Sequence, residues 1–272
     1  MLTITFIRHG ESEDNLLPIW AGWRDAPLSR LGRMQAAALG QSFASTHITA
    51  IYSSDLKRAH STARAIQQHQ SPTPPINVLR DLREMNFGLA EGNPWQVQGD
   101  TTGMSMEQIE RLCSEQNVFF MIYERDIPYP EGESLNDVAR RADKVIREFV
   151  LRHLVQPLSS PGVPASRNQH IALTSHGLCI GELIPALLRL DPEAPTGEYF
   201  ADLRNTAWFR AVVQVRHDYP TDTVDAGNLP PLRVTITHRH QIGHYQLIRE
   251  LVPGHDGRDG ARAETHALSH AF

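Results

Sequence analysis

The sequence predicts an α/β fold with three α/β/α layers, in which a mostly parallel central sheet is flanked by helices. Short runs rich in β-branched residues alternate along the chain with amphipathic stretches of helical spacing. The first run, at 2–7, becomes apolar on both faces near its end, which is typical of a strand covered on both sides. The chain has 272 residues, of which 40% are hydrophobic, and this suffices for one sizeable core.

Six stretches are expected to be strands. In the first, Leu2, Ile4 and Phe6 alternate with threonines, and Gly10 then allows a sharp turn into a short acidic helix. The remaining strands are expected at 49–52, 76–79, 170–175, 205–215 and 232–238.

Helices are expected where apolar residues recur at a spacing of three and four after a capping residue. Ser29 and Ser134 are such caps, for helices at 30–44 and 134–154. The other expected helices are a short one within 11–23 and longer ones at 55–69, 105–124 and 178–190.

Residues 86–130 interrupt the alternation of strands and helices. We interpret this stretch as an inserted helical cap that forms a lid over the end of the first strand, although an ordinary surface helical pair explains the pattern equally well. The predicted organisation is one domain at 1–253, with the cap at about 86–130. The polar, glycine-rich tail at 254–272 is expected to be disordered.

Composition narrows the possible partners and compartments. A net charge of −5 argues against a nucleic-acid partner. Cys113 and Cys179 lie too far apart to indicate a disulfide framework, and they predict a reducing, cytoplasmic location. Neither a signal peptide nor a membrane-spanning run is visible, so no membrane association is expected. His238 and His240 share a strand face without an acidic or cysteine partner, so no metal site is expected.

A cluster of charged and imidazole side chains is expected at one edge of the sheet. Arg8 and His9 follow the first strand, at the carboxyl end where open α/β sheets bind ligands. An arginine offers a planar cation for phosphate, and a histidine beside it can be a nucleophile toward phosphorus. The combination recurs, because His176 ends another apolar strand and Arg58 lies near the start of a helix that follows a short strand.

These residues form an ordered set of motifs that resembles the histidine phosphatase superfamily, which has the phosphoglycerate-mutase-like fold. The matching blocks are Arg8-His9-Gly10 with Asn15; Ala21-Gly22-Trp23 with Pro27-Leu28-Ser29 and Gly32; Ser53-Ser54-Asp55-Leu56 with Arg58, Ala59 and Thr62; Leu82-Arg83-Glu84 with Gly88 and Glu91-Gly92; Pro130-Glu131-Gly132-Glu133-Ser134; and Ser175-His176-Gly177.

The resemblance implies a mechanism without a metal or organic cofactor. His9 attacks phosphorus to give a phosphohistidine, and Glu84 protonates the leaving oxygen and then activates water. Arg8, Arg58 and His176 stabilise the phosphoryl group as further catalytic residues. The substrate-binding residues implied are Arg8, Asn15, Ala21, Gly22, Arg58, Glu84, His176 and Gly177.

The block after the acid favours a phosphatase. Mutases of the superfamily generally carry Arg and Tyr there, whereas Glu84-Met85-Asn86-Phe87-Gly88 has neither. The 130–134 block and Asn205-Thr206 resemble the TIGAR-type fructose-2,6-bisphosphatases and broad-specificity phosphatases. We therefore expect hydrolysis of phosphomonoesters of small metabolites, such as fructose 2,6-bisphosphate. A phosphoglycerate mutase and a non-catalytic phosphate-binding regulatory protein are the alternatives, and the oligomeric state is left open.

Overall fold

The computed structural model describes residues 1–155, 168–195, 197, 200, 203–216 and 231–251. Its centre is one six-stranded sheet with the strand order β3-β2-β4-β1-β5-β6. The strands are β1 (Leu2–Arg8), β2 (Ala50–Ser53), β3 (Ile76–Val78), β4 (Gln169–Ser175), β5 (Trp208–Val215) and β6 (Leu232–Gln241).

The sheet is mixed, with a parallel half and an antiparallel half. Strands β3, β2, β4 and β1 pair in parallel, whereas β5 pairs antiparallel with both β1 and β6. In the parallel half Arg8 lies opposite Ser175, and Ser53 lies opposite Thr174. The carboxyl ends of β1, β2 and β4 therefore meet at one edge of the sheet, as the strand pattern predicts.

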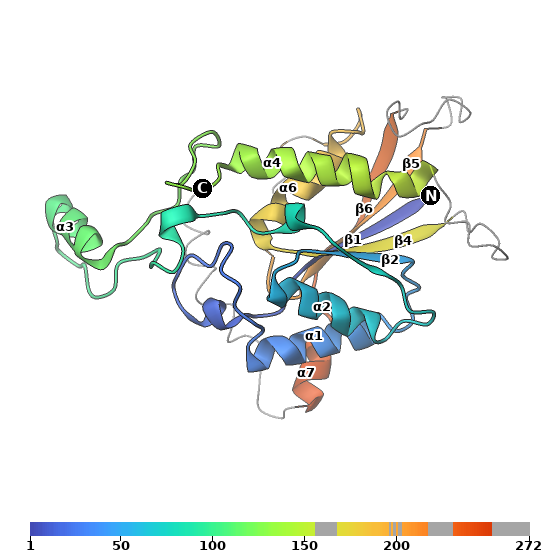
Figure 1. Ribbon diagram of the computed structural model, residues 1–272, viewed down its shortest axis with the longest axis horizontal. Helices are drawn as coiled ribbons and strands as arrows, with labels where there is room; N and C mark the ends of the chain where they lie inside the picture. The colour runs from blue at the N-terminus through green and yellow to red at the C-terminus, as the bar shows by residue number, and fades with distance from the viewer. Residues whose placement is uncertain (156–167, 196, 198–199, 201–202, 217–230, 252–272) are drawn as a thin grey trace.

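Helices cover both faces of the sheet, which confirms the predicted three layers. In Figure 1, α4 and α6 lie on one side of the sheet, and α1, α2 and α7 lie on the other. The helices are α1 (Arg30–Ser42), α2 (Lys57–Gln67), α3 (Met106–Gln116), α4 (Leu135–Lys144), α5 (Arg152–Val155), α6 (Gly177–Leu188) and α7 (Tyr245–Leu251). Short 3₁₀ turns are η1 (Glu13–Leu16), η2 (Arg80–Leu82) and η3 (Gly88–Ala90), and η4 (Val145–Val150) is π-helical.

Two hydrophobic clusters fill the spaces between these layers. Ile4 and Phe6 of β1 belong to the larger cluster, which includes α4 and α6 residues such as Ile180. Ile7 points to the opposite face and packs in the smaller cluster with Leu39 of α1. Successive strand residues alternate between faces, so β1 is buried on both sides and holds the residues that follow it in a fixed position.

The insertion at 86–130 differs from its predicted structure. Its helix α3 ends at Gln116 instead of near residue 124, because Asn117 adopts a left-handed conformation with φ of 51°. The chain then turns back, and the N–H of Phe119 donates to the carbonyl of Pro94 at 3.0 Å. Figure 1 shows α3 at the end of the molecule, away from the sheet. The helix itself therefore does not cover the strand ends, although residues at its base do approach them.

Two other helical features were not predicted. Helix α7 packs against α1, and the expected long helix at 134–154 is interrupted by the π-helical turn η4 between α4 and α5.

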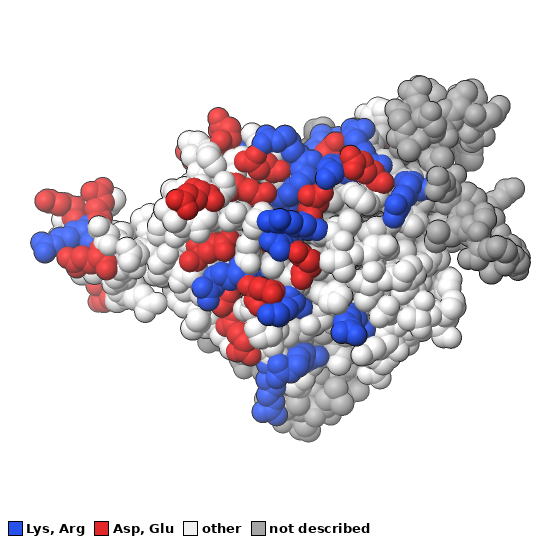
Figure 2. All heavy atoms as spheres, in the orientation of Figure 1, with Lys and Arg blue, Asp and Glu red and all other residues white. Residues whose placement is uncertain are grey.

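Figure 2 shows acidic and basic side chains intermixed over the visible face. Within the described ranges, none of the helices has the length and apolar character needed to cross a membrane. The single-domain boundaries at 1–253 stay a prediction, and the tail at 254–272 lies outside the described residues.

Candidate active site

His9 and His176 meet at the carboxyl ends of β1 and β4. These strands are adjacent and parallel, and the N–H of His9 donates to the carbonyl of Ser175 at 3.0 Å. The centroids of the two imidazole rings lie 4.9 Å apart. Both side chains are buried, so the sheet brings together two histidines that are far apart in the sequence.

His9 has a defined tautomer. Its Nδ1 lies 2.6 Å from the carbonyl oxygen of Gly10, which can only accept, so Nδ1 carries the proton. Its Nε2 is then the unprotonated nitrogen, and the Nε–H of Arg58 donates to it at 3.3 Å. Burial and the nearby charges of Arg58 and Arg8 hold the pKa of His9 well below its ordinary value. A neutral imidazole with an unprotonated nitrogen is the form that nucleophilic attack requires.

Arg58 is fixed by three acceptors. Besides His9, it donates to the carbonyl of Arg24 through Nη1 at 2.6 Å and to the carbonyl of Gly22 through Nη2 at 2.7 Å. Its side chain is 1% exposed. Arg8 donates through Nη1 to the carbonyl of Leu203 at 2.5 Å. Two guanidinium groups therefore flank His9 with little freedom to move.

The Gly22 loop depends on the half-buried carboxylate of Glu91. Gly22 has φ of 46°, and a Cβ there would approach Oε1 of Glu91 to 2.2 Å. Glu91 Oε1 accepts from the N–H groups of Trp23 at 2.8 Å and Phe87 at 3.1 Å. Burial raises the pKa of Glu91. This carboxyl thus joins the Gly22 loop to the start of the insertion.

Glu84 lies at the N-terminus of α6. Its Oε1 accepts from the N–H groups of Met85 at 2.9 Å and Cys179 at 3.3 Å, and its Oε2 accepts from Leu178 at 3.3 Å. A helix N-terminus offers unpaired N–H groups and a partial positive charge, which orient a carboxylate. The structure thus places Glu84 in the same pocket as His9 and Arg58.

Arg141 fixes the backbone of Arg83 and Glu84 by hydrogen bonds to their two carbonyl groups. Its Nη2 donates to the Glu84 carbonyl at 3.0 Å, and its Nη1 donates to the Arg83 carbonyl at 2.6 Å. Arg141 is paired with Glu133, whose Oε2 accepts the N–H of Asn86 at 2.9 Å. Asp55, which was expected to open α2, forms an ion pair with Arg83 at 2.6 Å instead.

His176 differs from the other predicted binding residues because it is not among the residues that line the pocket. Its Nε2 lies 3.0 Å from Oγ of Ser54, and its Nδ1 is buried without a hydrogen-bond partner among the described residues. Burial and the charge of Arg58 hold its pKa well below the ordinary value. In this structure His176 contacts the His9 ring.

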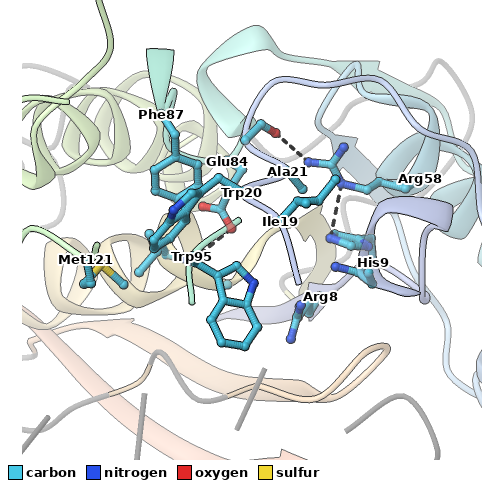
Figure 3. A pocket seen from close by; sticks show the side chains of 14 residues that line it. Arg8, His9, Ile19, Trp20, Ala21, Arg58, Glu84, Phe87, Trp95 and Met121 are labelled. Carbon is cyan, nitrogen blue, oxygen red and sulfur yellow. Dashed lines mark hydrogen bonds between the residues drawn. The ribbon is translucent and has the colours of Figure 1, made fainter. Parts of the chain in front are cut away.

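The pocket wall contains most of the predicted residues and adds an apolar set. Predicted residues in the wall are Arg8, His9, Asn15, Ala21, Gly22, Arg58, Glu84 and Gly177. Residues that the sequence analysis did not assign are Ile19, Trp20, Phe87, Trp95, Met121 and Leu178 (Figure 3). Two features of the sequence could have indicated these apolar residues. Trp20 directly precedes the Ala21-Gly22 block, and Phe87, Trp95 and Met121 belong to the insertion that was expected to lie over the site. Among the described residues, no group of three or more metal-ligating side chains is present.

Comparison with known proteins identifies the class. The profile of the histidine phosphatase superfamily (branch 1) matches residues 4–217. A 2,3-bisphosphoglycerate-dependent phosphoglycerate mutase from Bartonella henselae is 32% identical over 195 residues, which cover 70% of this chain and 84% of the relative. The chain therefore belongs to the histidine phosphatase superfamily, as the motifs predicted, and it is an enzyme of the histidine phosphatase type.

Solved structures share the fold. A mycobacterial glucosyl-3-phosphoglycerate phosphatase has a TM-score of 0.61 at 24% identity, covering 88% of this chain and 99% of that one. A putative alpha-ribazole-5'-P phosphatase from Escherichia coli has a TM-score of 0.58 at 19% identity, covering 88% and 96%. The narrower resemblance to TIGAR-type enzymes stays a prediction.

Proposed function

We propose that this enzyme is a phosphatase that hydrolyses phosphomonoesters of small molecules through a phosphohistidine at His9. The observation that carries the proposal is the neutral His9 ring, whose unprotonated Nε2 faces Arg58. Nε2 forms a bond to phosphorus as the ester P–O bond breaks, and the leaving oxygen takes a proton from Glu84. Water then attacks phosphorus while Glu84 takes one of its protons, and the P–N bond breaks with its electron pair returning to Nε2. This step releases inorganic phosphate and restores neutral His9 and protonated Glu84.

Arg8 and Arg58 act in both steps by stabilising the phosphoryl oxygens. A transferring phosphoryl group spreads its charge over three oxygens, and prepositioned cations stabilise that charge without reorganisation. The backbone acceptors that fix Arg58 support this role. In the same proposal His176 supports the His9 ring and contacts the phosphoryl group once it is bound, and Asn15, Ala21, Gly22 and Gly177 contact the substrate.

A phosphoglycerate mutase is the second candidate, because the relative at 32% identity carries that description. A mutase retains a bisphosphate intermediate and needs cationic groups for both of its phosphates. Among the described residues that line this pocket, the arginines are Arg8 and Arg58 and there is no lysine. The segment after Glu84 has neither of the Arg and Tyr that superfamily mutases generally carry. Both observations favour hydrolysis.

The finer assignments belong to the same proposal. Fructose 2,6-bisphosphate is a candidate substrate on motif resemblance, and a cytoplasmic location follows from the cysteine composition. Chemistry without a metal is also part of the proposal, so activity should persist after treatment with EDTA.

One experiment distinguishes the candidates. The purified enzyme is incubated with 3-phosphoglycerate and a trace of 2,3-bisphosphoglycerate, and phosphorus NMR follows 2-phosphoglycerate and inorganic phosphate. A parallel screen covers sugar phosphates, phosphopeptides and aryl phosphates. Release of phosphate without an isomer supports the phosphatase. Accumulation of 2-phosphoglycerate makes the protein a mutase, and the absence of turnover on every compound makes it a phosphate-binding protein.

A further inference from the structure

Opposite the two arginines, the pocket has an apolar wall. We use this name for the set Trp20, Phe87, Trp95, Met121 and Leu178. A further apolar lining residue, Ile19, lies beside Arg58 and His9 in Figure 3. Figure 3 shows Phe87, Trp20, Trp95 and Met121 on one side of the pocket and the arginines with His9 on the other, with Glu84 between the two groups. A substrate whose phosphate reaches His9 therefore extends its organic group toward the apolar wall.

The aromatic part of this wall is already rigid without a ligand. Trp20 is 8% exposed, and its Nε1–H donates to the carbonyl of Phe119 at 2.7 Å. Its ring centroid lies 4.6 Å from that of Phe87 and 5.6 Å from that of Tyr129. The Trp20 ring is tilted to these two rings by 47° and 60°. Aromatic side chains held in this way lose little conformational freedom when a ligand binds.

The insertion places Trp95 in the pocket. The N–H of Trp95 donates to the carbonyl of Pro18 at 3.2 Å, and the N–H of Trp20 donates to the carbonyl of Asn93 at 3.0 Å. The two segments therefore run side by side, which carries Trp95 to the pocket. In Figure 3 its indole lies between Met121 and Arg8. Trp95 is only half-buried, so part of its ring is open to a ligand.

The distribution of charge over the described lining residues argues against binding of a second anion at this wall. Among the described lining residues, Arg8 and Arg58 are the only arginine or lysine side chains, and Glu84 is the only carboxylate. Both guanidinium groups lie beside His9, where the reacting phosphate must be. A second phosphate or a carboxylate at the apolar wall would lose its water without gaining a cation, which is costly.

We infer that the pocket selects phosphomonoesters whose organic group is apolar, with an aromatic ring as the favoured shape, and discriminates against bisphosphates. The inference therefore argues against the candidate substrate fructose 2,6-bisphosphate. This inference rests on the proposed phosphatase function and names its substrate class. Burial of a phenyl-sized group against the apolar wall should raise kcat/KM about 10–100-fold over a polar group of similar length.

The first test compares 2-phenylethyl phosphate with glycerol 3-phosphate. Both are esters of primary alcohols, so the departing oxygens are chemically alike and the ratio of kcat/KM values reports on the organic group. We expect a ratio of about 10–100 in favour of the phenyl compound. Phosphate release from both at equal efficiency would overturn the selectivity while leaving the phosphatase intact. A failure to release phosphate from either would overturn both.

Two substitutions link the ratio to the apolar wall. Trp95→Ala should lower the preference for 2-phenylethyl phosphate about tenfold, because it removes a large part of the aromatic surface. Met121→Lys adds a cation at a half-buried position and should raise efficiency on fructose 1,6-bisphosphate relative to 2-phenylethyl phosphate roughly fivefold.

The matched control is Met106→Lys, the same change on α3 at a residue that is 69% exposed and outside the pocket. It should leave the substrate ratio unchanged. Thermal unfolding curves establish that each variant is folded. Unchanged ratios in folded Trp95→Ala and Met121→Lys proteins, or a change in Met106→Lys as large as in Met121→Lys, would overturn the inference.

Discussion

The two sides of the pocket differ in how their side chains are held. At the phosphate side, His9 follows β1 and Arg58 lies in the first turn of α2; both are buried and are fixed by backbone carbonyls. At the apolar wall, Phe87, Trp95 and Met121 come from an insertion whose helix α3 projects away from the sheet. The sheet and the elements that directly follow its strands therefore supply the groups that act on phosphorus, whereas the insertion supplies much of the surface that contacts the organic group. Changes at the first side should affect every substrate alike, and changes at the second should affect some substrates only.

The largest expected effect follows from His9→Ala. The substitution removes the nucleophile, so turnover and acid-labile phosphorylation of the protein should both be lost on every substrate. Radiolabelled substrate followed by acid treatment measures the phosphoenzyme. His153→Gln changes a buried histidine that contacts Tyr52 instead of the pocket, and this control should retain turnover. Normal turnover in His9→Ala would contradict the mechanism.

Glu84→Gln should separate substrates by leaving group. General acid catalysis contributes about 10²–10⁴-fold, and an aryl phosphate needs it little. We therefore expect the loss to be larger by about that factor on sugar phosphates than on aryl phosphates, with phosphohistidine still formed from the aryl compound. Steady-state kinetics on both substrates measure the difference.

The comparison for this variant is Glu91→Gln. Glu91 holds the Gly22 loop beside the pocket, and burial raises the pKa of its carboxyl. Equal losses on both substrates in Glu84→Gln, together with a selective loss in Glu91→Gln, would transfer the acid role to Glu91.

Arg58→Ala should cost about 2–4 kcal/mol in activation free energy, because it removes a fixed donor to the transition-state phosphoryl group. The loss should be the same for 2-phenylethyl phosphate and glycerol 3-phosphate, since both present the same phosphate. Measured kcat/KM values for the two substrates check this. Arg80→Ala, an exposed arginine that stacks on Trp23, is the control. A loss confined to one substrate would show that the two sides of the pocket are not independent.

The smallest effect concerns pH. Burial holds the pKa values of His9 and His176 well below the ordinary value, and it lowers that of His244 to about 4. As pH falls below 6.5, the unfolded chain binds protons that the folded protein does not, so the free energy of unfolding decreases. The expected loss between pH 7.5 and 5.5 is about 1 kcal/mol per buried histidine.

Urea unfolding at the two pH values measures this loss, and His244→Gln should reduce it by about 1 kcal/mol. Residues 86–130 contain no histidine, so deleting the exposed α3 segment should leave the pH dependence unchanged. An increase in stability on acidification would reverse the assigned direction of the shifts.

Local sequence patterns predicted the sheet well because each strand ends in a recognisable way. The run from Leu2 to Ile7 becomes apolar on both faces near its end, and β1 is buried on both faces. The insertion was predicted less well. Helical spacing continues past Gln116, yet Asn117 turns the chain and Phe119 pairs with Pro94. That pairing brings together segments more than twenty residues apart, and a local sequence pattern cannot predict such a contact.

Sequence by itself determined the class of this protein, because the chemistry of phosphoryl transfer requires particular side chains after particular strands, and Arg8, His9, Arg58, Glu84 and His176 appear there. Tertiary structure alone decided how they are used. The tautomer of His9 depends on the Gly10 carbonyl, and the place of Glu91 depends on the positive φ of Gly22. The apolar wall exists only because the segments around Trp20 and Trp95 lie side by side. Motifs encode local chemistry, whereas the shape of a pocket depends on contacts between distant parts of the chain.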